Sequence, residues 1–135
     1  MQTEQINWLA VIVAAVSMFL VGGLWYSPIL FGKTWQRANG FSDEDLNRFN
    51  KVRSFGGSLI LALVMAANLG VFLAHPGTTL RWGIIAGLLA GVGWVATAIA
   101  MTALFEGRPW SYIVVNAGYH IVAFALMGAI LGGWR

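Results

Sequence analysis

The sequence predicts an all-α integral membrane protein, a four-helix bundle with two short interfacial helices between the first and second membrane spans. Of its 135 residues, 59% are hydrophobic and only 10% are charged, whereas soluble domains usually carry about 25% charged residues. The apolar residues also form four long runs, each close to the roughly 20 residues that cross a bilayer. Lipid is therefore the solvent for most side chains, and residues 1–135 are expected to form a single transmembrane domain.

The first span is expected at residues 8–26. No Lys or Arg precedes it, whereas a secretory signal peptide would carry a basic region before its apolar run. The run is therefore interpreted as a retained helix. Pro28 is expected to end it, because proline has no amide hydrogen and disfavours helix in the preceding residue.

The loop at residues 27–54 is expected to hold the two short helices. Phe31 and Trp35 have helical i,i+4 spacing, and Gly40 is a helix stop. Ser42 then caps a second helix, with Asp45 at the capping-box position. Acidic residues occupy the first turn of this expected helix, and basic residues, up to Arg53, occupy its end, as the helix dipole favours. We expect both helices to lie on the cytoplasmic surface against anionic lipid, and the alternative is a docking site for a partner protein.

The remaining spans are expected at residues 55–74, 82–105 and 110–133. Short connections containing Pro76 and Pro109 make successive spans antiparallel. Gly83, Gly87 and Gly91 recur at every fourth position of the third span. Small residues let helix backbones approach closely in lipid. This stripe predicts packing inside the bundle and also a homo-oligomer interface.

Basic residues set the expected orientation. Six of the eight Lys and Arg residues lie in the loops after the first and third spans, and two, Arg81 and Arg135, lie on the opposite side. Positively charged loops stay in the cytoplasm. Both termini are therefore expected outside and the long loop in the cytoplasm.

Charge and cysteine content exclude several classes. The net charge of +3 comes from a few residues between apolar segments, so these charges are interpreted as topology signals and no nucleic acid is expected as a partner. Cysteine is absent, which excludes disulfides and thiolate chemistry.

Several polar residues are predicted at similar depth inside the membrane. Counting 1.5 Å per residue from Trp110 places His120 about 15 Å into a core about 30 Å thick. Asn116 lies one turn below it on the same face, and Tyr119 adjoins that face. The other candidates for a ligand-binding layer are Trp94, Asn68, Thr97 and Ser17.

This layer has two interpretations. Polar groups in hydrocarbon need partners, so the layer could simply lock the helices together. An ionisable residue inside the membrane also suggests a binding or proton-active site. The spans hold no carboxylate, which argues against a four-helix multidrug antiporter. His120 has too few neighbouring ligands for a metal, and His75 lies too far from it for bis-histidine haem.

A second candidate region is the cytoplasmic mouth of the bundle, formed by Tyr26, Glu106 and Arg108. A local ion pair between Glu106 and Arg108 is the simpler interpretation. A gate below the polar layer is the alternative.

Several segments together resemble the domain of unknown function 1761 family, a group of small bacterial membrane proteins. They are Asn7-Trp8, Leu24-Trp25-Tyr26-Ser27-Pro28 with Phe31-Gly32-Lys33 and Trp35, Phe105-Glu106-Gly107-Arg108-Pro109, Asn116-Ala117-Gly118-Tyr119-His120 and Met127-Gly128-Ala129-Ile130-Leu131-Gly132. The resemblance implies a four-helix, multi-pass fold in the bacterial cytoplasmic (inner) membrane, and it adds no substrate. It also implies that the segments around Tyr26, Glu106 and His120 matter to the family.

The function favoured by the sequence is that of a non-enzymatic homo-oligomer whose midplane polar site could bind or pass a small solute. Phosphate-loop, metalloprotease and nucleophile-elbow motifs are absent, so no catalytic residue and no cofactor are assigned. The alternative is a structural or accessory subunit in which the polar layer only locks the helices. A membrane enzyme acting on lipid is the third interpretation.

Overall fold

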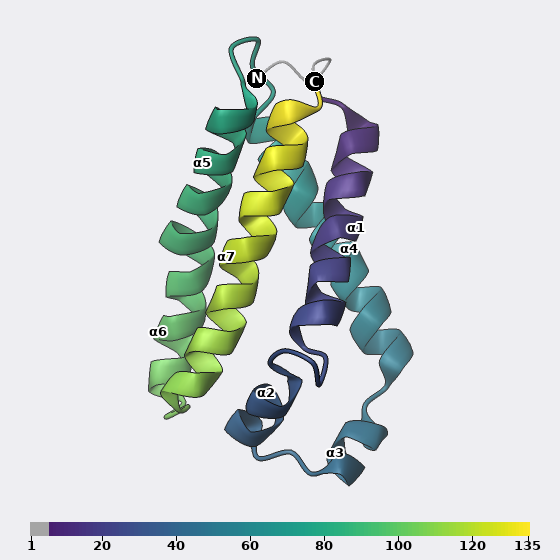
Figure 1. Ribbon diagram of the computed structural model, residues 1–135, viewed down its shortest axis with the longest axis vertical. Coiled ribbons are helices and arrows are strands. Elements are labelled where there is room, and N and C mark those ends of the chain that lie inside the picture. The colour runs from purple at the N-terminus through teal and green to yellow at the C-terminus, as the bar shows by residue number, and fades with distance from the viewer. Residues whose placement is uncertain (1–5) are drawn as a thin grey trace.

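A computed structural model describes residues 6–135, and this part of the chain is built from helices connected by short turns (Figure 1). The elements in chain order are α1 (Trp8–Trp25), α2 (Gly32–Asn39), α3 (Asp43–Arg48), α4 (Lys51–Phe72), α5 (Leu80–Ala90), the π-helical turn η2 (Gly91–Ala96), α6 (Thr97–Phe105) and α7 (Trp110–Gly133).

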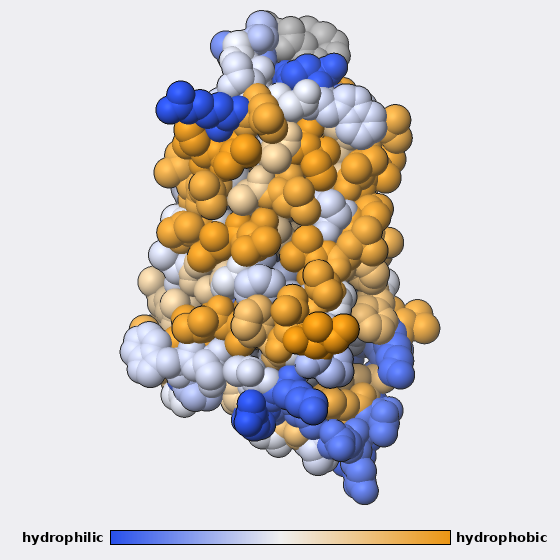
Figure 2. Space-filling model, in the orientation of Figure 1, coloured by the Kyte–Doolittle hydropathy of each residue, from blue (hydrophilic) through white to orange (hydrophobic). Residues whose placement is uncertain are grey.

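Four helical segments are long and apolar enough to cross a membrane: α1, α4, α5 through α6, and α7. They run up and down, and the start of α1 lies at the same end of the bundle as the end of α7 (Figure 1). An apolar surface covers the middle of the molecule, and hydrophilic residues gather at its two ends (Figure 2). The chain is an all-α, multi-pass membrane protein, as the sequence predicts.

Capping hydrogen bonds mark both ends of helix α1. The Asn7 side chain accepts a hydrogen bond from the Ala10 amide (3.1 Å), which satisfies one of the free donors of the first turn. At the other end the Tyr26 amide bonds to the Gly22 carbonyl (3.0 Å). Pro28 follows two residues later, and the chain then turns into α2 at the end of the bundle opposite the start of α1.

The two short helices form with the predicted signals. Gly40 ends α2 in the left-handed conformation (φ 70°). Ser42 and Asp45 form the predicted capping box at the start of α3. Lys51 and Arg53, however, do not close α3. They belong to the first turn of α4, because the Asn50 side chain caps that helix by accepting from the Arg53 amide (3.1 Å).

The third membrane-spanning segment contains a feature that the sequence did not predict. A π-helical turn, η2, separates α5 from α6 near the middle of the span. Such turns hold one residue more than an α-helical turn and often occur at functional sites. Beyond α6, Gly107 (φ 68°) makes the tight turn that leads into α7.

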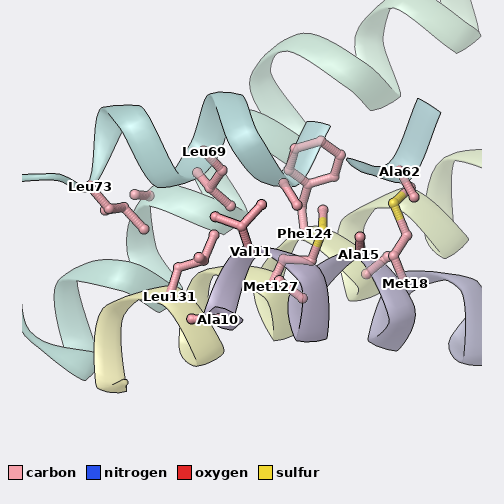
Figure 3. Packing of buried hydrophobic residues seen from close by; sticks show 14 of the residues in the cluster. Ala10, Val11, Ala15, Met18, Ala62, Leu69, Leu73, Phe124, Met127 and Leu131 are labelled. Carbon is pink, nitrogen blue, oxygen red and sulfur yellow. The ribbon is translucent and has the colours of Figure 1, made fainter. Parts of the chain in front are cut away.

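Small residues bring the long helices into close contact. Ala10, Ala14 and Ala15 of α1 are fully buried, with Ala66 of α4 and Ala123 of α7. Larger side chains such as Leu73, Phe124 and Met127 fill the space between these helices (Figure 3). Close approach through alanine is the packing expected where lipid supplies no hydrophobic drive for helix association.

Helices α5 and α7 are in closer contact still. A Cβ added at Gly83 would overlap the backbone of Gly128, and one added at Gly87 would overlap the carbonyl of Phe124. The predicted glycine stripe therefore packs inside the bundle, where α7 covers it.

Candidate functional site

A pocket of about 710 Å³ lies between α1, α4 and α7, towards the end of the bundle that carries α2. Helix α2 contributes Trp35 to its lining. The volume falls in the range of sites that hold small organic ligands.

Asn116 and His120 bring the predicted polar face of α7 to this pocket, together with Tyr119. The Tyr26 hydroxyl donates to Asn116 Oδ1 (2.6 Å), and Asn116 Nδ2 donates to the Tyr112 carbonyl one turn below (3.0 Å). Tyr26 is the residue after α1, so the Tyr26–Asn116 bond joins the end of α1 to α7. One N–H of the Asn116 amide keeps no partner among the residues that the structure describes.

Tyr119 ties α7 to α1 at a second point. Its hydroxyl donates to the Met18 carbonyl (2.9 Å). A Cβ at Gly22 would lie 3.0 Å from that hydroxyl. Gly22 therefore leaves the room in which the Tyr119 ring crosses α1.

His120 has a different environment. Its Nδ1 is buried and has no hydrogen-bond partner among residues 6–135. The imidazole lies beside the Tyr119 ring, with centroids 4.8 Å apart. Nearly all buried polar groups in proteins are paired, so an unpaired one calls for an explanation such as a ligand or a water.

A continuous series of aromatic rings runs from the short helices to His120. Phe49 contacts Phe41 (centroids 5.3 Å apart), which contacts Trp35 (5.5 Å), which contacts Tyr26 (5.9 Å). Tyr26 contacts Tyr119 (5.4 Å). Helix α2 is thereby held against the pocket through Trp35.

The wall formed by α4 was missed by sequence reasoning. It consists of residues at helical spacing along one face, and those that reach the pocket are Ser54, Phe55, Ser58, Leu61, Ala62 and Met65. Ser54 and Ser58, two serines at i,i+4 near the start of the apolar part of α4, were the available signal. A serine near the end of a span also suits the membrane interface, so the spacing alone does not predict a pocket wall.

Three of the predicted layer residues lie outside the pocket, on the outer surface. Asn68 donates to the Val64 carbonyl (2.9 Å), and Thr97 donates to the Gly93 carbonyl (2.9 Å). Trp94 is 80% exposed. Asn68 and Thr97 donate to carbonyls of their own helices and bond to no other helix among the described residues. Ser17 is half-buried, donates to the Ala14 carbonyl (2.6 Å), and does not line the pocket either.

The residues predicted at the mouth separate into two places. Tyr26 lines the pocket, whereas Glu106 and Arg108 lie at the α6–α7 turn. These two form an ion pair of 3.7 Å at partly exposed positions. The Arg108 guanidinium also lies over the Tyr112 ring, 5.1 Å from its centroid.

The side chains that line the pocket determine which kinds of ligand it can bind. No Asp, Glu, Lys or Arg side chain is among the lining residues that the structure describes. Nor does any group of three or more His, Cys, Asp or Glu residues in this part of the chain have the arrangement to hold a metal ion. The lining offers aromatic rings, hydroxyls, one amide and one imidazole, which suits binding by packing and hydrogen bonds.

The family of the chain follows from a comparison with family models. Residues 9–132 match the model described as "Protein of unknown function (DUF1761)". The chain belongs to this family. The matched residues include all four membrane-spanning segments of this DUF1761 protein except Trp8 at the start of α1 and Gly133 at the end of α7. Comparisons with curated proteins and with solved structures found no match.

Proposed function

We propose that this DUF1761 protein is a non-enzymatic membrane protein that binds or passes a small solute in the pocket between α1, α4 and α7. The observation that carries the proposal is the pocket of about 710 Å³ whose lining includes an imidazole with an unpaired buried nitrogen. Residues that serve packing alone normally have their polar atoms satisfied. A bound solute would fill this volume and contact the His120 imidazole that lines it.

The second candidate is a structural or accessory subunit, and specific contacts favour it. The Tyr26–Asn116 and Tyr119–Met18 hydrogen bonds both join α1 to α7. Interhelical bonds of this kind contribute about 0.6 kcal/mol each in membranes. They account for Tyr26, Tyr119 and Asn116 without a ligand, but they leave the pocket and His120 unexplained. A lipid-modifying enzyme has less support, because Glu106 is paired with Arg108 away from the pocket.

The proposal includes an orientation and partners. Six basic residues lie at the end of the bundle that carries α2 and α3: Lys33, Arg37, Arg48, Lys51, Arg53 and Arg108. They favour a cytoplasmic location for that end, with both termini outside, in the bacterial inner membrane. There they would meet anionic lipid. The proposal also includes a homo-oligomer. Because α7 covers the glycine stripe, the support for the homo-oligomer is the outer face around Trp94 and Phe105, both exposed.

Cysteine accessibility tests the site directly, since the chain has no cysteine of its own. A His120→Cys variant should react with a small water-soluble thiol reagent. Prior treatment with a thiol reagent applied from the side of the membrane that carries α2 should block this reaction. The matched control is Ala117→Cys, one turn away on the same helix at a buried position, which should stay unlabelled.

The contrary result would be a folded His120→Cys protein that never labels, together with a His120→Gln protein of normal stability and cellular effect. That pair of results would leave only the structural role for the pocket.

A further inference from the structure

We propose that the pocket takes a planar, uncharged, lipid-soluble carbonyl compound, of which an isoprenoid quinone is the chemical type. This inference rests on the proposed function and specifies its ligand. Four properties of the lining lead to it: the absence of charged side chains, the exposure of the α4 wall, the aromatic rings, and the hydrogen-bond donors.

Charge is the first property. The lining residues that the structure describes include no Asp, Glu, Lys or Arg. Bringing an ion from water into such a lining without a counter-charge would be strongly unfavourable. The ligand is therefore uncharged.

The route of entry is the second property. Phe55 and Leu61 line the pocket from α4 and are still 58% and 60% exposed. Gly23, which lines it from α1, is also exposed, and a Cβ there would meet no atom within 4 Å. These residues belong to segments that span the membrane. The pocket thus opens sideways towards lipid, and its ligand is a molecule dissolved in the bilayer.

The aromatic rings are the third property. Phe19, Trp35 and Phe55 line the pocket together with Tyr26 and Tyr119. Aromatic rings gain most from stacking or edge contacts with another flat π-system. A planar head group would use this wall better than a bulky saturated one, and an apolar chain could leave between α1 and α4.

Hydrogen bonding is the fourth property. The buried Nδ1 of His120 has no acceptor nearby within residues 6–135, and a buried N–H without an acceptor is rarer than a buried acceptor without a donor. The proton of the neutral imidazole is therefore assigned to Nε2, the nitrogen left to face the pocket. With the spare N–H of Asn116, the pocket presents two donors, which carbonyl oxygens complement.

The test uses the full chain in nanodiscs of phosphatidylcholine, with decylubiquinone as the probe and decylbenzene, which lacks the carbonyls, as the matched apolar compound. Decylubiquinone should raise the melting temperature and saturably quench tryptophan fluorescence, and decylbenzene should do neither. His120→Leu should weaken quinone binding by about tenfold, the loss expected for one hydrogen bond in a dry site. Asn68→Leu, which alters a polar residue outside the pocket, should bind as the unchanged protein does.

A second variant covers the case in which His120→Leu does not fold. Ser58→Cys places a thiol on the α4 wall of the pocket, and decylubiquinone should slow its reaction with a membrane-permeant maleimide while decylbenzene should not. Equal labelling with and without decylubiquinone would overturn this inference. If the cysteine at position 120 still labels in that case, the proposed function survives, whereas an unreactive position 120 would end both.

Discussion

Tyr26 is the single residue on which most contacts of the pocket converge. It follows the last turn of α1, its hydroxyl donates to Asn116 on α7, and its ring contacts Trp35 of α2 and Tyr119 of α7. It thereby joins the two short helices to the membrane-spanning bundle. His120, at the other end of the aromatic series, has the opposite character, because its buried Nδ1 contacts no partner in the described chain.

Removing the Tyr26 hydroxyl should weaken the junction between α1 and α7. We expect Tyr26→Phe to lower the free energy of unfolding by about 0.5–1.5 kcal/mol, because the Asn116 carbonyl oxygen loses its donor. Denaturant or thermal unfolding in detergent would measure this. Tyr112→Phe is the matched control, since no hydrogen bond of the Tyr112 hydroxyl occurs among residues 6–135. Equal stability of the two variants would contradict the assigned role.

At the scale of elements, the tightest contact is the one between α5 and α7. Gly83 and Gly87 of α5 face Gly128 and Phe124 of α7 so closely that a Cβ would overlap backbone atoms. Backbone cannot move aside as a flexible side chain can. The two helices therefore form a hairpin that holds α7, and with it Asn116 and His120, in a fixed position beside α1.

Adding a single methyl group at Gly87 tests the packing of α5 against α7. Gly87→Ala should destabilise the protein by about 1–3 kcal/mol, as overpacking of a filled interior does, and Gly87→Leu should lower the yield of folded protein further. Gly56→Ala, at a helical position where a Cβ meets nothing within 4 Å, should be neutral or slightly stabilising. An unchanged melting profile for Gly87→Ala would mean that α5 and α7 do not pack in this way.

The sequence predicted the existence and the caps of the helices well, because these depend on local signals. Hydrophobic length identified the four apolar segments, and Ser42, Asp45 and Gly40 act as their residue types suggest. It did not predict that α4 starts at Lys51 or that η2 interrupts the third span. Several polar residues near Asn50 have side chains that can cap a helix, so the sequence does not identify the start of α4. A π-helical turn does not change the composition of a span, so hydrophobicity does not reveal it.

The candidate site was predicted on α7 and, from the expected mouth of the bundle, at Tyr26. Lipid and protein interior are equally apolar, so hydrophobicity does not reveal how a membrane helix is rotated about its axis. Asn68, Trp94 and Thr97 were placed in the layer by depth, but their helices turn them outwards. The wall from α4 depends on the position of that helix beside α1 and α7, which no local pattern encodes. Whether His120, Asn116 and Tyr119 bind a ligand stays a prediction.

At the scale of the whole molecule, apolar and charged residues are arranged along one axis. The apolar surface occupies the middle, and hydrophilic residues lie at both ends (Figure 2). The end with α2 and α3 carries most of the basic residues, and the other end carries the start of α1 and the C-terminus (Figure 1). This asymmetry is what the proposed orientation depends on.

A topology reporter would test the orientation. A reporter that is active only in the cytoplasm should be silent when fused after Arg135, because the positive-inside bias keeps the opposite end of the bundle in the cytoplasm. The same reporter inserted in the turn at Asn39–Gly40 should be active. Activity of the fusion after Arg135 would reverse the proposed orientation.

The π-helical turn η2 changes the direction around the helix axis in which the side chains of α6 point, relative to those of α5. Each α-helical residue advances about 100° around the axis. The twelve steps from Gly91 to Ala103 would therefore place these two residues about 120° apart around the axis of a regular helix. One residue absorbed by the wider turn reduces the difference to about 20°. Gly91 and Ala103 are both buried, and α7 packs along both η2 and α6. Without that offset, one half of the third span would turn its small residues away from α7.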